Sequence, residues 1–325
     1  MMNINSQLDA AAALFRIKFF RSKFPVVVTW SITDKCNYKC IYCQRWQKDH
    51  SSLPTKEVFR IIDQLKKLHC ARISFSGGEP LLRDDMGDII VYSKKNGISS
   101  TVITNGSLVP EKIEWLVNTD LLEISLDGPR EINDLIRGQG SYDKAMQALK
   151  AAKNAAIKVV LSTVLTRYNL DCLGFFLDVA ENFNVGLTFG PVGYIHSRDS
   201  VIDSLAPDKE KLSNFADELV TAKKAGRPVL NSITALEYMK SYPLPEKIPC
   251  FAGKAFCHVG AGGELYPCAT MQNKQYNSKT GDFMAAFKNL FCDNQCGGCW
   301  CMGTLELNRL LDFQLSVIPE FIKLS

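Results

Sequence analysis

The sequence predicts an α/β fold with a parallel sheet, and three observations support this class. The chain has 325 residues, of which 46% are hydrophobic and 22% charged, so it is globular and long enough to bury a large core. Runs rich in β-branched residues alternate with segments whose apolar residues recur at helical spacing, which is typical of right-handed βαβ units. Polar and glycine-containing segments follow the strand-like runs, where parallel α/β folds gather their chemistry. Periodicity alone does not distinguish a barrel from a doubly wound sheet.

Six strands and five intervening helices are expected. The first strand, residues 25–32, is rich in valine, and the first helix has Val58, Ile61 and Leu65 at helical spacing. The expected strands are residues 25–32, 72–76, 99–104, 121–126, 157–163 and 185–189. The expected helices between them are residues 55–68, 85–96, 110–118, 141–155 and 171–183. A later amphipathic helix, residues 207–224, ends at Gly226.

Three cysteines directly follow the first strand. Cys36, Cys40 and Cys43 are separated by three and two residues, so one short loop can bring three thiolates to one face of a metal centre. A cubane iron–sulfur cluster normally takes four Cys ligands, and three would leave one iron open. Open coordination positions are typical of catalytic metal sites. Half of a zinc site and a Cys40–Cys43 redox pair are the alternatives at this point.

The second strand ends in Gly77-Gly78-Glu79-Pro80. A C-x3-C-x2-C loop followed by this segment resembles the radical S-adenosylmethionine (radical SAM) superfamily. The resemblance implies a partial (β/α)6 TIM-type barrel whose three-cysteine loop holds a [4Fe–4S] cluster, with S-adenosylmethionine (SAM) on the open iron. It also implies that the Gly-Gly-Glu-Pro segment contacts the SAM amino group. Gly77 and Gly78 are expected to let the backbone approach a ligand closely, and Glu79 can accept from an ammonium group.

The same resemblance supplies the other candidate SAM contacts. Tyr42 matches an aromatic position that packs on the adenine. Ser125 and Asp127, at the end of the fourth strand, suit the ribose hydroxyls, and Arg137 is a candidate for the SAM carboxylate by analogy. Thr104 and Asn105 lie at the end of the third strand and belong to the same predicted pocket. Polar residues at such positions also form ordinary turns, and the sequence leaves this alternative open.

A second group of cysteines lies near the C-terminus. Twelve cysteines without a secretory signal favour metal binding over disulfides, and seven of them fall between residues 250 and 301. Their arrangement resembles the SPASM/Twitch extension of radical SAM enzymes, which holds auxiliary [4Fe–4S] clusters; a zinc ribbon is the alternative. The preferred ligands of one auxiliary cluster are Cys250, Cys268, Cys296 and Cys299, with Cys257, Cys292 and Cys301 in reserve. A second auxiliary cluster with an open iron stays an alternative, because two closed clusters need eight thiolates. Cys70 and Cys172 are expected to be ordinary buried thiols.

Five segments are predicted. They are an N-terminal basic amphipathic helix (1–24), the core barrel (25–195), a helical connection (196–249), the SPASM/Twitch domain (250–303) and C-terminal helices (304–325). The N-terminal helix is expected either to pack across the barrel mouth or to rest on a membrane surface. No apolar run reaches the ~18 residues of a membrane span, and no signal peptide is evident, so the predicted location is cytoplasmic, with membrane association through that helix as a variant. A net charge of +4 argues against nucleic acid as a partner.

The predicted reaction is reductive cleavage of SAM to a 5′-deoxyadenosyl radical, which abstracts hydrogen from a small molecule, lipid or peptide. The auxiliary cluster is expected to assist electron transfer or substrate binding, and an external low-potential donor such as flavodoxin or ferredoxin is implied. The alternatives are a ribosomal-peptide maturase of the SPASM type, a methyltransferase of the same superfamily, and a non-catalytic iron–sulfur or zinc protein. The sequence shows no separate peptide-recognition domain before the first strand, which weakens the case for a peptide.

Overall fold

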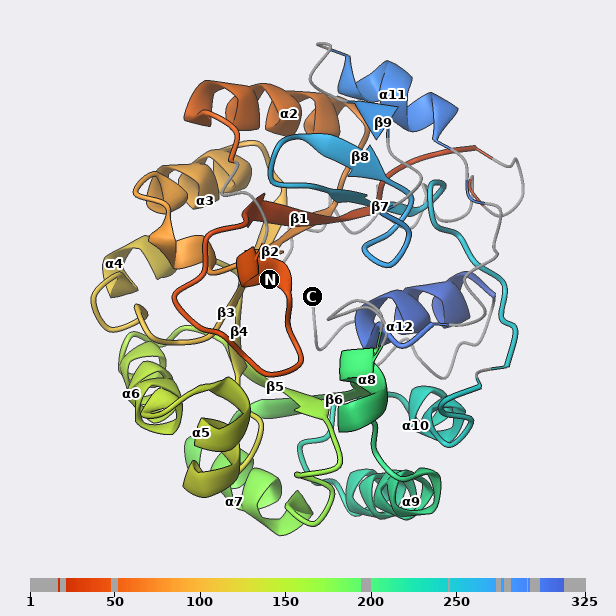
Figure 1. The fold of residues 1–325 in the computed structure, drawn as a ribbon. Coiled ribbons are helices and arrows are strands. Elements are labelled where there is room, and N and C mark those ends of the chain that lie inside the picture. The colour runs from red at the N-terminus through yellow and green to blue at the C-terminus, as the bar shows by residue number, and fades with distance from the viewer. Residues whose placement is uncertain are drawn as a thin grey trace.

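The computed structural model describes residues 17, 22–47, 52–193, 200–244, 246–272, 276–277, 282–290, 292 and 299–312. Six parallel strands curve into a partial barrel with helices on its outer side (Figure 1). The strands are β1 Val27–Thr33, β2 Arg72–Gly77, β3 Ser99–Thr104, β4 Leu121–Ser125, β5 Val159–Leu165 and β6 Gly186–Pro191. The outer helices are α2 Thr55–Lys67, α3 Met86–Lys95, α4 Ile113–Leu116, α5 Arg130–Arg137, α6 Ser141–Asn154 and α7 Leu173–Phe183. The predicted α/β partial barrel is confirmed.

The Cys-rich extension continues the sheet of the barrel. Strand β7, Phe256–Val259, pairs in parallel with β1, and β8, Glu264–Tyr266, and β9, Tyr276–Asn277, follow antiparallel. The described residues therefore form one nine-stranded sheet, in the order β6-β5-β4-β3-β2-β1-β7-β8-β9, where six strands were predicted. β7 has only four residues and includes a cysteine and a histidine, so its sequence lacks a recognisable strand pattern.

Helices cover the open side of the barrel between β6 and β7 (Figure 1). The connection contains α8 Ser200–Leu205, α9 Lys209–Lys224 and α10 Ile233–Met239, and the extension adds α12 Met302–Leu311 on the same side. The other helix of the extension, α11 Phe283–Asn289, lies against α2. Helix α12 buries Leu305 and Leu307, and the Glu306 carboxylate accepts a hydrogen bond from the backbone N–H of Ser232, just before α10. The C-terminal segment is thus tied to the barrel by both apolar and polar contacts.

Two helical segments differ from the prediction. The helix expected at residues 110–118 has only four helical residues, because turns occupy the segment after Pro110. Helix α5 was not expected, since its segment was interpreted as part of the loop after the fourth strand. α5 begins directly after Pro129, whose fixed φ suits the start of a helix.

The two faces of the barrel wall differ in polarity. The outer face, under the helices, is apolar and fully buried, as at Trp30, Phe75 and Ile124. The inner face alternates with it and stays partly accessible along β2, β4 and β6. Strand register places Ser125, Ser162 and Thr188 side by side on that inner face. Helices therefore stabilise the barrel from outside, while its interior is lined with hydroxyl groups.

Most of the predicted N-terminal helix lies outside the described residues. Ile17 is described, and it is buried with Val26 and Ala71 at the N-terminal ends of β1 and β2, away from the expected barrel mouth. Within the described parts of the chain, no helix combines the length and apolar character needed to cross a membrane.

Candidate functional site

The three cysteines of the first motif lie together in the loop after β1. Cys36, Cys40 and Cys43 are partly buried free thiols; the charges of Cys36 and Cys43 act on Cys40, and the charge of Cys43 acts on Cys36. The backbone N–H of Tyr38 donates to the Cys36 sulfur at 3.5 Å, and N–H···S contacts are one means by which proteins tune iron–sulfur clusters. The structure thus brings together the predicted ligand set.

Four contacts hold this loop in place. The amide of Asn37 joins the loop after β3 in both directions, accepting from Asn105 Nδ2 and donating to the Ser107 hydroxyl, each at 2.8 Å. The N–H of Ile41 donates to the carbonyl of Ile136 in α5 at 2.9 Å. The ends of the loop are joined by the Asp34–Arg45 ion pair at 3.1 Å. The loop is therefore held by two neighbouring strand ends as well as by its own sequence.

The donor chemistry of this site fits an iron–sulfur cluster with SAM. Burial raises the pKa of Cys40 to about 12, opposed by the nearby Arg137, so a metal must displace the thiol proton on binding. No three His, Cys, Asp or Glu side chains in the described residues converge on a single ion, but a cubane spreads its thiolate ligands over separate irons. The Tyr38 hydroxyl is buried without a hydrogen-bond partner in the described structure, which suits a group that meets a ligand.

Gly77 and Gly78 lie in close contact with the backbone at the end of β1 and just after it. A Cβ on Gly77 would lie 2.2 Å from the Thr33 carbonyl oxygen, and one on Gly78 would lie 2.0 Å from that of Lys35. The N–H groups of Gly78 and Glu79 donate to those same carbonyls at 2.8 Å. The glycines thus allow β2 to touch the backbone that leads into Cys36, and the close approach of this backbone to a ligand stays a prediction.

We expect Gly78→Ala to cost about 1–3 kcal/mol, because a methyl group cannot fit against the Lys35 carbonyl without moving the loop. The variant should also retain less iron after anaerobic reconstitution. Urea unfolding and iron quantitation test both effects. Gly174→Ala in α7 is the matched control. A Cβ added there would meet nothing within 4 Å, so we expect the free energy of unfolding to rise by about 0.5–1 kcal/mol. Equal stability of Gly78→Ala and wild type would show that this close approach is not required.

Glu79 holds neighbouring loops. Its carboxylate is fully buried and accepts from the N–H groups of Leu81 and Asn105 and from the hydroxyl of Thr104, at 2.8–3.1 Å. Burial raises its pKa to about 7, against the effect of these hydrogen bonds. Thr104 and Asn105 are thereby tied to the end of β2 beside Pro80. The Glu79 side chain positions these loops, and its contact with an ammonium group stays a prediction.

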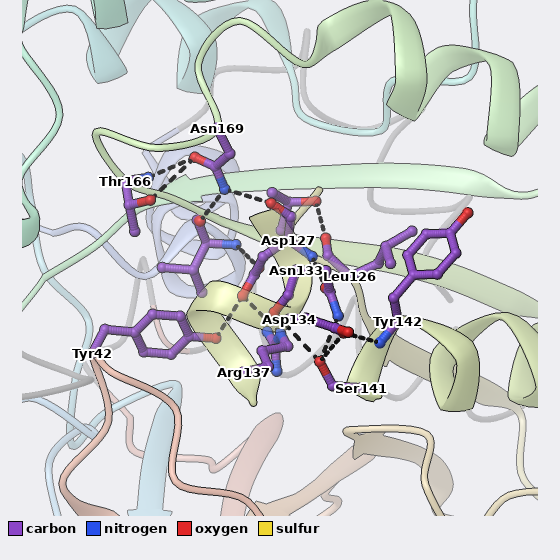
Figure 2. Close-up of polar contacts among 12 residues, drawn as sticks. Tyr42, Leu126, Asp127, Asn133, Asp134, Arg137, Ser141, Tyr142, Thr166 and Asn169 are labelled. Carbon is purple, nitrogen blue, oxygen red and sulfur yellow. Dashed lines mark hydrogen bonds and ion pairs between the residues drawn. The ribbon is translucent and has the colours of Figure 1, made fainter. Parts of the chain in front are cut away.

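Asp127 is the centre of a buried network (Figure 2). Its Oδ2 accepts from the Tyr42 hydroxyl at 3.0 Å and pairs with Arg137 Nε at 2.7 Å, while its Oδ1 accepts from the Val164 N–H at 2.9 Å. Its own N–H donates to Asn133 Oδ1 at 2.8 Å. Asp127 has no exposed surface and positions the groups bonded to it, and its contact with the ribose of SAM stays a prediction.

Tyr42 and Arg137 form one side of the site. The guanidinium carbon of Arg137 lies 5.7 Å from the centre of the Tyr42 ring, and its charge reaches Cys36 and Cys40. Arg137 is therefore placed where an anionic ligand group beside the cluster would meet a cation. Ser125, in contrast, is partly accessible at the end of β4.

Comparison with known proteins identifies the domain. A family profile described as the Radical SAM superfamily matches residues 30–179. Residues 30–179 form a radical SAM domain. This confirms the family predicted from the two motifs, and with it an enzyme superfamily that uses a [4Fe–4S] cluster and SAM.

Several relatives share more of the chain than this domain. The mycofactocin maturase MftC of Mycolicibacterium smegmatis is 30% identical over 255 residues, which cover 75% of this chain and 64% of that protein. An AdoMet-dependent heme synthase of Methanosarcina barkeri is 25% identical over 300 residues, 82% of each chain. The PqqA peptide cyclase of Granulibacter bethesdensis is 27% identical over 75% of this chain and 67% of its own length. Streptococcus suis SuiB, in a crystal structure bound to S-adenosylmethionine, matches with a TM-score of 0.68 at 16% identity, over 86% of this chain and 69% of its own.

Three cysteines of the extension, Cys250, Cys268 and Cys292, pack against one small hydrophobic cluster. A hydrogen bond from Cys292 and burial raise the pKa of Cys250, and Cys268 adds its charge. Cys299 and Cys301 form a second group, and the charge of Cys268 also raises the pKa of Cys299. Cys296 lies outside the described residues. Which of these thiols bind a metal remains a prediction.

The remaining cysteines lie elsewhere. Cys257 is 1% exposed in β7, within the main hydrophobic core and close to Cys70. Cys70 and Cys172 are buried, as predicted. The reserve ligand Cys257 is therefore separated from the Cys250, Cys268 and Cys292 group.

Trp300 connects the extension to the barrel. It packs on Tyr238 and Tyr242, with ring centres 5.3 and 5.1 Å away, and against Gly193 just after β6. A cavity of about 470 Å³ lies beside it, lined by Arg167, Val192, Gly193, Ile202, Asp203, Ala206, Pro207, Asp208, Lys209, Tyr242, Pro243 and Trp300. The segment between Cys299 and Cys301 thus faces a cavity at the C-terminal end of the barrel.

Proposed function

We propose that the protein is a radical SAM enzyme that removes a hydrogen atom from a peptide substrate. The observation that carries this proposal is the anchored loop of Cys36, Cys40 and Cys43, three partly buried thiols with a buried cation, Arg137, beside them. When bound, the cluster supplies the electron that cleaves SAM to the 5′-deoxyadenosyl radical. An external low-potential donor such as flavodoxin or ferredoxin is part of this proposal.

The residues around the loop supply position. Asp127 holds the guanidinium of Arg137, which would pair with the SAM carboxylate, and the Tyr42 ring would pack on the adenine. The Tyr38 hydroxyl, buried and unpartnered in the described structure, is free to donate to bound SAM. These groups order the ligand before reaction, which is the contribution a protein makes to cofactor chemistry.

A peptide is the favoured substrate class. Two relatives that share three quarters of this chain are called a maturase and a peptide cyclase. The chain spans 64% of the length of MftC, so this transfer of substrate class is our proposal. The cavity beside Trp300 supports it, because aromatic rings and charges of both signs line it, as a peptide with mixed side chains requires. The heme synthase similarity makes an iron porphyrin the second candidate.

We further propose that Cys250, Cys268 and Cys292 hold one auxiliary cluster, with a fourth thiolate from Cys296 or Cys299. The pairing of Cys250 with Cys292 supports this assignment. A cytoplasmic location accords with the twelve cysteines, which suit a reducing compartment.

Anaerobic reconstitution tests the proposed function. With SAM and dithionite, the protein should form 5′-deoxyadenosine, and omission of dithionite should prevent it. Peptides built from fully deuterated amino acids should then transfer deuterium into 5′-deoxyadenosine, whereas an iron porphyrin with deuterated side chains should not. Absence of reductant-dependent 5′-deoxyadenosine from protein with a full iron complement would refute the enzyme, and transfer from the porphyrin alone would refute the peptide.

A further inference from the structure

Glu123 is an acidic side chain on the inner wall of the barrel. It lies in β4 in register with Ile103 of β3 and Val160 of β5. Leu122 and Ile124 on either side of it are fully buried toward the outer helices, whereas Glu123 is partly accessible from the interior. The carboxylate therefore lines the interior, where a substrate would enter.

Among the described residues, no ion pair compensates the charge of Glu123. The Ser162 hydroxyl donates to it, and burial raises its pKa. Asp120 is the acidic group that acts on Arg72 and Lys158, the basic groups near the starts of β2 and β5. His258 of β7 is another basic residue, and its ring is hydrogen-bonded to the hydroxyls of Thr29 and Ser31. A carboxylate in such a place is costly unless a cation pairs with it or it takes up a proton.

The other buried carboxylates near the site are fully engaged. Glu79 accepts three hydrogen bonds, and Asp127 accepts two hydrogen bonds in addition to its Arg137 ion pair. Their partners are already in place in the protein. Glu123, whose one donor in the described part of the chain is the Ser162 hydroxyl, still has lone pairs for a donor from outside.

The position of Glu123 along β4 indicates how long a ligand side chain must be to reach it. Ser125, two residues further along β4, lies in register with Ser162 at the strand ends, just before the Asp127 network beneath the cysteine loop. Two residues of a strand correspond to about 6–7 Å, so Glu123 lies about that far below this level. A lysine or arginine side chain has a comparable length. Its charged end can thus reach Glu123 while a carbon near its backbone stays at the level of the cysteine loop.

We propose that Glu123 recognises a cationic group of the substrate, an alkylammonium or guanidinium, in the interior of the barrel. The proposal rests on the proposed function and specifies its substrate class: a peptide that presents a basic side chain. Ser162 orients the carboxylate, and the hydroxyls of Ser125 and Thr188 line the path to it.

Ligand-observed NMR on the anaerobically reconstituted holoenzyme, with SAM and an oxidised cluster, tests this proposal. The probes are n-butylammonium and its neutral counterpart 1-butanol. Wild type should bind n-butylammonium at least about tenfold more tightly, and Glu123→Gln should abolish the preference, since the amide keeps the size of the side chain but lacks its charge. Glu114→Gln is the matched control, because Glu114 is an exposed residue of α4. This variant should keep the preference for n-butylammonium.

A second pair of probes distinguishes a peptide from a free amine. Acetyl-lysine methylamide should bind at least as well as n-butylammonium, and acetyl-norleucine methylamide should not bind detectably. No ammonium preference in wild type, or a preference that survives Glu123→Gln, would overturn the proposal, as would binding of free amine with exclusion of the blocked lysine. The same wild-type sample is assayed for reductant-dependent 5′-deoxyadenosine. Loss of that product would count against the proposed function, whereas loss of ammonium preference alone counts against Glu123.

Discussion

Replacement of Cys36, Cys40 or Cys43 by alanine should abolish 5′-deoxyadenosine formation, with a loss of at least about a thousandfold. Even groups that only orient metal ligands are worth about 10–100-fold in affinity or activity, so loss of a ligand itself must cost more. The three thiols share one loop and influence one another, so no neighbouring thiol in that loop can substitute for a missing one. Reconstituted variants are compared by iron content, by the EPR signal of the reduced cluster and by chromatographic quantitation of 5′-deoxyadenosine.

Cys172→Ala is the matched control for these variants. Cys172 is a buried thiol just before α7, so its loss tests the effect of removing a sulfur atom without touching the cysteine loop. We expect wild-type iron in the loop site and wild-type product from this control. Substantial product from Cys36→Ala, Cys40→Ala or Cys43→Ala would contradict the proposed ligand set, since the cluster would then depend on other groups.

The predictions that succeeded were those based on strong local patterns. β3 and α6 lie within one residue of their predicted bounds, because continuous apolar periodicity determines both. The cysteine spacing and the Gly-Gly-Glu-Pro segment sufficed for the superfamily, since both occupy strand ends that a parallel sheet brings together.

The failures arose where tertiary contacts decide the structure. β7 is a strand because it pairs with the free edge of β1, and the pattern of its four residues does not indicate a strand. The protein partners of Glu79 and Asp127 were not predicted, because sequence shows a polar residue but not the groups that it contacts. Asn133 and Asn169, which hold the backbone of Asp127, lie six and 42 residues away from it in sequence, and their roles appear only once the strands are assembled.

Asp127→Asn should be the most destabilising single change of a charged group near the site, with an expected loss of about 3–5 kcal/mol. The side chains of Asp127 and Arg137 are 0% and 7% exposed, so removal of the carboxylate charge leaves a guanidinium buried without its counter-ion. Tyr42 also loses an acceptor of full charge, and with it an anchor of the cysteine loop. Urea unfolding measures the loss, and iron retention after reconstitution measures its effect on the loop.

Asp143→Asn provides the matched comparison, because it breaks an ion pair of the same chemistry between Arg130 of α5 and Asp143 of α6. Both of those side chains are 50% exposed, so water screens the pair and a cost below about 1 kcal/mol is expected. The double variant Asp127→Asn with Arg137→Gln should be more stable than Asp127→Asn alone, since it removes the stranded charge as well. If Asp127→Asn costs no more than Asp143→Asn, the network around Asp127 does not hold the loop. If instead the double variant regains stability but not iron, the two effects separate: the ion pair would support folding through charge compensation, and Arg137 would support the cluster through its position.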